Sequence, residues 1–331
     1  MSRNRTIVLL LGFFYFATRF LAAQSSTCEQ RLVPVTLVSR DGDFATGFSL
    51  SDFELGPHSS ESIKLVSVAP DSRPRRIVIL LDVSGSMAGP STSSWNVVPE
   101  FVRDLASDDS PNLRFALLLF SDRVMETIDF SQDRSAVGHR LKAISEDPAF
   151  LKQYVHGRTA LYDALQSGFQ LLRNPTSADS LLVVTDGGDT DSKISLDHLL
   201  DELSSSSTRV FSVLFTRRLY ERNDPHQDFL KLKEFTEFVQ RSGGDVFGPL
   251  LVNRAGQYAM TNPQRTTKPL PQELTEFYKE MLENSVLSVK ANTSLTKSIK
   301  LELHSSTQMK EKWKGAMLLF PHQLGPCFSP N

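Results

Sequence analysis

The chain has 331 residues, which is enough for one large domain with extensions or for two smaller domains, and either arrangement can bury a core without help from metals or disulfides. The composition, with 40% hydrophobic and 22% charged residues, excludes a disordered or fibrous protein. A formal net charge of −2 at pH 7 gives no support to a nucleic-acid partner.

Residues 1–23 have the pattern of a secretory signal peptide. Arg3 and Arg5 precede an apolar run over residues 7–17, and small residues near Ala23 offer a cleavage site. The run is shorter than the roughly 20 residues that a membrane span needs, so a retained membrane anchor is the weaker alternative. Cleavage would remove three arginines and no acid, which changes the net charge from −2 to −5. We therefore expect a protein that is secreted or held in the periplasm or cell envelope, with no stable membrane span after cleavage.

Residues 24–73 are predicted to form a small N-terminal β extension. Apolar and β-branched residues dominate 32–38 and 63–68, and the turn signal Asp-Gly-Asp at 41–43 lies between these segments. Residues 70–76 are polar and contain proline, which is typical of a linker.

The two cysteines, Cys28 and Cys327, lie near opposite ends of the chain. Export to an oxidising space would allow them to pair and to clasp the termini together. Two unrelated thiols are the alternative interpretation.

Residues 74–290 alternate between apolar strand segments and amphipathic helical segments, which predicts an α/β domain with a doubly wound, mostly parallel sheet. Several strand segments are nearly all apolar, as strands covered on both faces must be. A hairpin over 114–130, with its turn at 121–123, adds one antiparallel edge strand. The predicted strands are 77–82, 113–121, 124–130, 181–185 and 210–215, and the predicted helices are 95–106, 135–144, 160–172, 196–203, 229–241 and 271–284.

Residues 291–331 are predicted to form a C-terminal β tail. Polar and apolar residues alternate over 298–303, and 316–320 is a second strand candidate. We expect the tail to pack beside the N-terminal strands.

The strand predicted over 77–82 ends in a carboxylate that is followed by two hydroxyls at alternate positions, Asp82, Ser84 and Ser86. Ligands of open α/β sheets bind at this carboxyl edge, and Gly85 allows the backbone to turn tightly there. Hard oxygen donors in a compact loop suit Mg²⁺, Mn²⁺ or Ca²⁺. Alone the pattern is weak, because Asp and Ser also cap helices.

Two later segments would complete an oxygen shell. Thr159 stands at a predicted helix start, and Asp186 follows the strand predicted over 181–185. Taken singly, Thr159 would be a helix cap and Asp186 a turn residue, so their order and spacing relative to the first loop carry the metal hypothesis. We interpret the nearby Asp189 and Asp191 as an acidic, solvated loop rather than a second metal site.

Asp-x-Ser-x-Ser at 82–86, a later Thr before an Ala-Leu helix start, and Thr-Asp-Gly at 185–187 together resemble the metal-ion-dependent adhesion site of the von Willebrand factor A family. The resemblance covers residues 75–290. Within that family the chain is similar to the secreted VWFA-related domains of Acidobacteria, which have a Val-Pro-Val-Thr strand and an Asp-Phe-Glu-Leu segment like those at 33–36 and 52–55. A bacterial source follows as an expectation.

The resemblance implies a role for each candidate ligand. Ser84, Ser86 and Thr159 would coordinate the cation through their hydroxyls, and Asp82 and Asp186 would coordinate it directly or through water. One position would stay open for a carboxylate of a protein partner. The implied activity is binding rather than catalysis, with no catalytic residue and no cofactor besides the cation.

Two other functions remain open at this stage. A secreted hydrolase could use Ser84 or Ser86 as its nucleophile, but the chain lacks a Gly-x-Ser-x-Gly elbow and a His-Glu-x-x-His helix. Alternatively, the cation could stiffen an envelope scaffold that binds no partner at this site.

Overall fold

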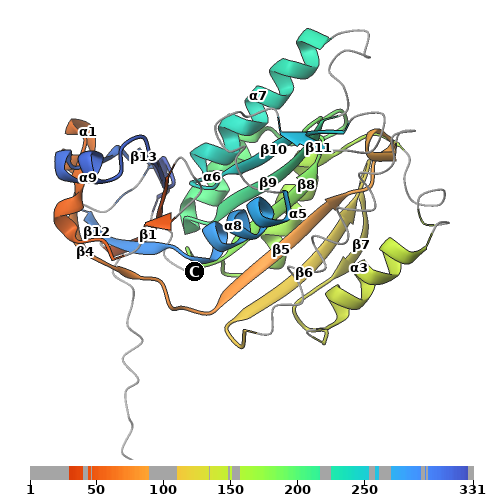
Figure 1. Ribbon diagram of the computed structural model, residues 1–331, viewed down its shortest axis with the longest axis horizontal. Helices are drawn as coiled ribbons and strands as arrows, with labels where there is room; N and C mark the ends of the chain where they lie inside the picture. Colours follow the sequence, from red (N-terminus) through yellow and green to blue (C-terminus); the bar gives the residue numbers. More distant parts are fainter. Residues whose placement is uncertain are drawn as a thin grey trace, which may run out of the picture.

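The computed structural model of the protein contains two units, a large α/β domain and a smaller β unit (Figure 1). Among the residues that the structure describes, none of the helices combines the length and the hydropathy that a membrane span requires. Residues 1–23, both cysteines and the helix predicted over 95–106 lie outside these ranges. The structure describes residues 30–39, 44–45, 47–88, 110–133, 135–147, 150, 157–216, 225–252, 258–260, 270–291, 295 and 297–326.

The α/β domain is built on a seven-stranded sheet of order β11-β10-β9-β8-β5-β6-β7. Neighbouring strands from β10 to β6 run parallel, and β7 is antiparallel to β6, as the sequence predicts for one edge. A second antiparallel strand, β11, closes the other edge beside β10. The strands are β5 (Arg75–Asp82), β6 (Leu113–Phe120), β7 (Val124–Ile128), β8 (Ser180–Thr185), β9 (Arg209–Thr216), β10 (Val246–Val252) and β11 (Tyr258–Met260).

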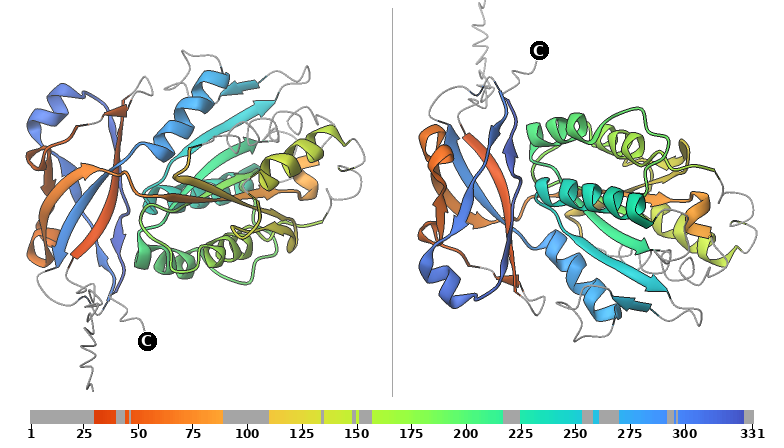
Figure 2. Two further views of the ribbon diagram at one scale, coloured as in Figure 1. Left: turned by 90° about the horizontal axis from the view of Figure 1, so that it is seen from below. Right: turned by 90° about the horizontal axis from the view of Figure 1, so that it is seen from above.

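Helices cover both faces of this sheet, which confirms the doubly wound α/β fold (Figure 2). Alternate residues of β5 point to opposite faces, so Ile79 packs with one set of helices and Leu80 with the other. Residues of α3 (Ala136–Glu146) and α8 (Leu270–Leu282) share the core of Ile79. The core of Leu80 includes residues of α5 (Leu161–Leu171), α6 (Leu196–Ser206) and α7 (Pro225–Arg241).

Strand β10 was not predicted, and its sequence explains why. Gly248 and Pro249 interrupt the apolar run, and such residues argue against a strand inside a sheet. The pairing of β10 with β9 shifts register between Phe247 and Leu250, and Gly248 has a φ of 112°. A bulge of this kind accommodates a proline within a paired strand.

The β unit is built from the beginning and the end of the described chain, and residues of both segments share one hydrophobic core. Its main sheet has the order β15-β1-β12-β4, and β2 also pairs with β1. Strand β12 belongs to this sheet, so the α/β sheet has ended before Ser285, rather than at the expected boundary of 290. These strands are β1 (Gln30–Val38), β2 (Phe44–Ala45), β4 (Ile63–Pro70), β12 (Ser285–Ala291) and β15 (Met317–Leu319).

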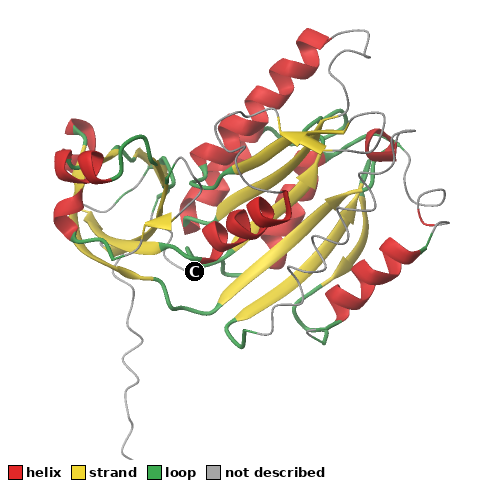
Figure 3. Cartoon of the chain, viewed as in Figure 1, coloured by secondary structure: helices red, strands yellow, loops and turns green. Residues whose placement is uncertain are grey.

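Short elements complete the β unit (Figure 3). The single strand expected over 298–303 is instead divided between β13 and β14, which pair with different partners. The elements are η1 (Leu50–Asp52), β3 (Phe53–Leu55), α1 (Pro57–Ser62), β13 (Ile299–Lys300), β14 (Leu303–Ser305), α9 (Thr307–Lys312) and β16 (Gln323–Leu324).

Buried Arg209, the first residue of β9, links the two units. Its guanidinium donates to Oγ1 of Thr36 in β1 at 3.1 Å, and to the carbonyl of Met281 and Oδ1 of Asn284 at 3.1 and 3.2 Å. Burial lowers the pKa of Arg209 to about 9. Arg31 of β1 adds a second link, because it donates to the carbonyl of Ser205 at 2.9 Å. The β unit therefore packs at the amino ends of the parallel strands and leaves their carboxyl ends uncovered by it (Figure 2).

Candidate metal centre

Asp82 is the last residue of β5, and its side chain is completely buried. Oδ1 accepts a hydrogen bond from the backbone N–H of Ser84 at 2.8 Å, and Oδ2 accepts one from the hydroxyl of Thr185 at 2.7 Å. Burial, and after it the nearby charge of Asp186, raise the pKa of Asp82 to about 7, although the hydrogen bonds from Thr185 and Ser84 act in the opposite direction. Asp82 is thus a buried acid close to a second acid.

The loop after Asp82 places two hydroxyls side by side. Ser84 is completely buried and Ser86 is half-buried, and their Oγ atoms are 3.1 Å apart. The main chain of this loop is anchored to the next strand, because the N–H of Val83 donates to the carbonyl of Phe120 at 2.7 Å. Ser86 lies in the short helix η2 (Gly85–Ala88).

Thr159 lies in a loop that touches the neighbouring loops on both sides. Its side chain is buried, and its carbonyl accepts hydrogen bonds from the N–H groups of Thr190 at 2.9 Å and Asp191 at 3.1 Å. Two residues earlier, the carbonyl of Gly157 accepts from the N–H of Gly85 at 3.3 Å. The Thr159 loop therefore joins the serine loop to the loop that follows β8.

Asp186 follows the last residue of β8, which is the strand beside β5 in the sheet. It is half-buried, and its Oδ1 accepts from the N–H of Gly188 at 3.1 Å. The adjacent Thr185 is completely buried, donates to Asp82 and accepts from the N–H of Gly187 at 3.1 Å. Thr185 therefore orients Asp82, although nothing in the Thr-Asp-Gly motif alone predicts this role.

The five predicted ligands thus come from three segments that contact one another at one edge of the sheet. Direct hydrogen bonds connect Asp82 with Ser84 and Ser84 with Ser86, whereas Thr159 is connected through main-chain contacts. The described residues contain no group of three or more His, Cys, Asp or Glu side chains able to hold a metal. The candidate site contains only two acids, and its other three ligands are hydroxyls, so the absence of such groups does not test it. The five-ligand set remains a prediction.

Charged side chains surround this edge. Arg158 is largely exposed and donates to Oδ1 of Asp191 at 3.1 Å, and Arg123 lies 3.3 Å from Oδ1 of Asp122. Exposed pairs of this kind contribute little to stability.

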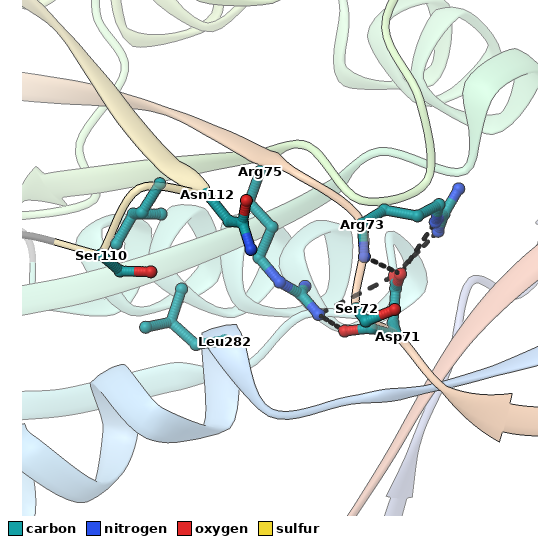
Figure 4. A pocket seen from close by; sticks show the side chains of 8 residues that line it. Asp71, Ser72, Arg73, Arg75, Ser110, Asn112 and Leu282 are labelled. Atoms are coloured by element: carbon teal, nitrogen blue, oxygen red, sulfur yellow. Dashed lines mark hydrogen bonds and ion pairs between the residues drawn. The ribbon is translucent and has the colours of Figure 1, made fainter.

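A hollow lies at the other end of β5. Its cavity of about 190 Å³ is lined by Arg75, which donates to the carbonyl of Asp71 at 2.9 Å (Figure 4). Arg75 also donates to Oδ1 of Asn284 at 2.5 Å. The carboxylate of Asp71 accepts from Arg73 at 2.8 Å. These contacts lie at the junction of the two units. Arg75 and Asp82 are the two end residues of the eight-residue strand β5, which separates them by roughly 23 Å. The lining residues are Asp71, Ser72, Arg73, Arg75, Ser110, Asn112, Leu113 and Leu282.

A doubly wound sheet with loops that meet at its carboxyl edge is the architecture expected of a von Willebrand factor A domain. The family described as VWA domain containing CoxE-like protein matches residues 56–226, which is more than half of the chain. The chain belongs to this family. Domains of the von Willebrand factor A class generally act as modules for protein interaction. The match does not distinguish the Acidobacteria branch, so that finer similarity stays a prediction.

Two solved bacterial structures match part of the chain. The conserved hypothetical protein BatB from Bacteroides thetaiotaomicron is 15% identical, with 62% of this chain and 98% of that chain covered and a TM-score of 0.41. An aerotolerance-related membrane protein from Bacteroides fragilis is 16% identical, with coverages of 62% and 87% and a TM-score of 0.33. No curated protein matches the chain. The family assignment rests on the family model, since both TM-scores lie below 0.5.

Proposed function

We propose that the protein is a non-enzymatic binding module that holds one divalent cation and uses it to bind a carboxylate of a protein partner. The ligands would be Asp82, Ser84, Ser86, Thr159 and Asp186. The observation that carries the proposal is the complete burial of Asp82 beside Ser84 and near a second acid.

A bound cation would offset the repulsion between Asp82 and Asp186 and the cost of burying a charged Asp82. Two neighbouring carboxylates repel each other, and burial weakens the solvation of the charged form. No lysine or arginine in the described part of the chain contacts Asp82, which accepts only from Ser84 and Thr185. A divalent cation would neutralise both acids, and the paired serine hydroxyls would offer it further oxygens.

The ligand types favour Mg²⁺, with Mn²⁺ or Ca²⁺ as alternatives. Mg²⁺ prefers oxygen ligands in octahedral geometry and keeps several waters when the protein offers few carboxylates. A partner carboxylate could replace one of these waters. Because three of the proposed ligands are neutral hydroxyls, the cation would retain enough positive charge to attract that carboxylate.

The geometry disfavours a hydrolase that uses either serine. Ser84 is completely buried, and its Oγ bonds to that of Ser86, while no histidine in the described ranges contacts either hydroxyl. A nucleophilic serine needs a general base within hydrogen-bond reach.

The proposed setting is extracellular or in the bacterial envelope, following the signal pattern of residues 1–23.

Selection from a random peptide library tests this function. Peptides retained by the full chain in Mg²⁺ should contain Asp or Glu and should be released by EDTA, because the cation would bridge protein and carboxylate. Replacing the selected Asp or Glu with Asn or Gln provides a matched control and should abolish retention. Peptides that bind equally well in EDTA, or after this replacement, would contradict the proposal.

A further inference from the structure

The N-terminus of α5 is capped by side chains from another loop. Its N-cap position is Ala160, which has no side-chain acceptor. Oδ1 of Asp189 instead accepts from the N–H of Leu161 at 2.9 Å. Oγ of Ser192 accepts from the N–H groups of Tyr162 at 2.9 Å and Asp163 at 3.2 Å. Three of the free amides at the start of a helix are thereby satisfied from a loop almost 30 residues away in sequence.

The same two segments are also joined in the opposite direction. The N–H groups of Thr190 and Asp191 donate to the carbonyl of Thr159. The N–H of Thr159 donates in the first direction, to Oγ1 of Thr190 at 3.0 Å. Oδ1 of Asp163 accepts from the N–H groups of Lys193 at 2.9 Å and Ile194 at 3.2 Å. We call this reciprocal set of hydrogen bonds, between residues 159–163 and 189–194, the interlock.

Asp189 lies at the centre of the interlock. Its Oδ1 accepts from the hydroxyl of Ser192 at 2.5 Å as well as from Leu161, so one carboxylate oxygen fixes both the loop and the helix start. Along the chain, Asp189 is three residues after Asp186, and Leu161 is two residues after Thr159. The expectation that Asp189 belongs to a solvated loop does not account for these contacts.

We infer that Asp189 is a positioning residue, which sets the distance between Thr159 and Asp186 and thereby controls the affinity of the cation site. The inference rests on the proposed function. Groups that orient metal ligands through hydrogen bonds typically change metal affinity by about 10–100-fold when they are removed. Asp189 would act in this way because it holds the main chain of both ligand-bearing segments.

The chain offers a matched control for ordinary helix capping. Ser195 is the N-cap of α6, where its Oγ accepts from the N–H of His198 at 3.3 Å. This cap joins residues of one segment only. Its loss should weaken a helix without changing the distance between the proposed ligands.

Calorimetric titration of the full chain with Mn²⁺ distinguishes the positioning of metal ligands from ordinary helix capping. Asp189→Ala should weaken Mn²⁺ binding by about tenfold or more, whereas Asp189→Asn should stay within about threefold of the unsubstituted protein, because the amide oxygen remains an acceptor. Ser195→Ala should lower the melting temperature in EDTA and leave Mn²⁺ affinity unchanged. Wild-type affinity in Asp189→Ala, or equal losses in the Ala and Asn variants, would overturn the inference.

Amide hydrogen exchange of the metal-free protein provides an independent readout. Asp189→Ala should accelerate exchange at Leu161 and also at Thr190 and Asp191, whose N–H groups donate across the interlock. Acceleration confined to Leu161 would overturn the positioning role. A complete lack of Mn²⁺ binding by the unsubstituted protein would instead contradict the proposed function, and the exchange data would still show whether the interlock exists.

Discussion

Asp82→Asn is expected to reduce the affinity for Mg²⁺ by about 100-fold or more while leaving the metal-free fold intact. The substitution removes one of two proposed anionic ligands, which should cost at least as much as losing a group that only orients a ligand. The amide has the shape of the protonated carboxyl group, so its oxygen can still accept from the N–H of Ser84. Calorimetry with Mg²⁺ and thermal unfolding in EDTA would measure the two effects.

Asp179→Asn is the matched control for this substitution. Asp179 is also buried, but it precedes β8 at the opposite end of the sheet and pairs with Arg76 at 2.7 Å. Loss of that ion pair should lower the stability and leave Mg²⁺ binding unchanged. Normal Mg²⁺ affinity in Asp82→Asn would exclude Asp82 as a ligand.

The affinity for Mg²⁺ is expected to fall steeply as the pH drops below about 7. In the metal-free protein, burial and the charge of Asp186 raise the pKa of Asp82 to about 7, so below that pH the cation must displace a proton. The dissociation constant should then increase by up to about tenfold per pH unit, or about 50-fold between pH 7 and pH 5, because about half of Asp82 is already protonated at pH 7. Titrations at pH 5, 6, 7 and 8 would measure this slope, and an affinity independent of pH over this range would contradict it.

The same pKa predicts how the stability of the metal-free protein changes with pH. Asp82 has a higher pKa in the folded protein than its ordinary value of 3.8, so the folded state binds the proton more tightly. Its stabilising contribution is present below about pH 4 and is lost as the pH rises through about 7, a change of at most about 4 kcal/mol. Mg²⁺ should restore stability above pH 7, and Asp82→Asn should show neither effect.

Local patterns were sufficient to predict the α/β domain. Strands such as β5 and β8 are continuous apolar runs because both of their faces are buried, and this pattern also located their carboxyl ends. The candidate ligands could therefore be assigned to one edge from the positions of Asp82 and Asp186 relative to these strands.

Features that depend on contacts between distant segments could not be predicted in this way. Strand β10 could not be predicted because it contains Pro249. The proline is compatible with a paired strand only because β10 bulges where it pairs with β9, and this bulge is seen only in the structure. Asp189 looks like an ordinary loop acid until its contact with Leu161, 28 residues away, is known. Nothing in the local sequence around Arg209 indicates that this residue is buried between the two units.

Anomalous diffraction from crystals grown with Mn²⁺ would test the central claim most directly. We expect one strong anomalous peak at the carboxyl ends of β5 and β8, within about 2.5 Å of the hydroxyl oxygens of Ser84, Ser86 and Thr159. Both carboxylates, Asp82 and Asp186, should contact that ion or its bound waters. A peak elsewhere, or none near Asp82 at millimolar Mn²⁺, would contradict the proposed metal centre.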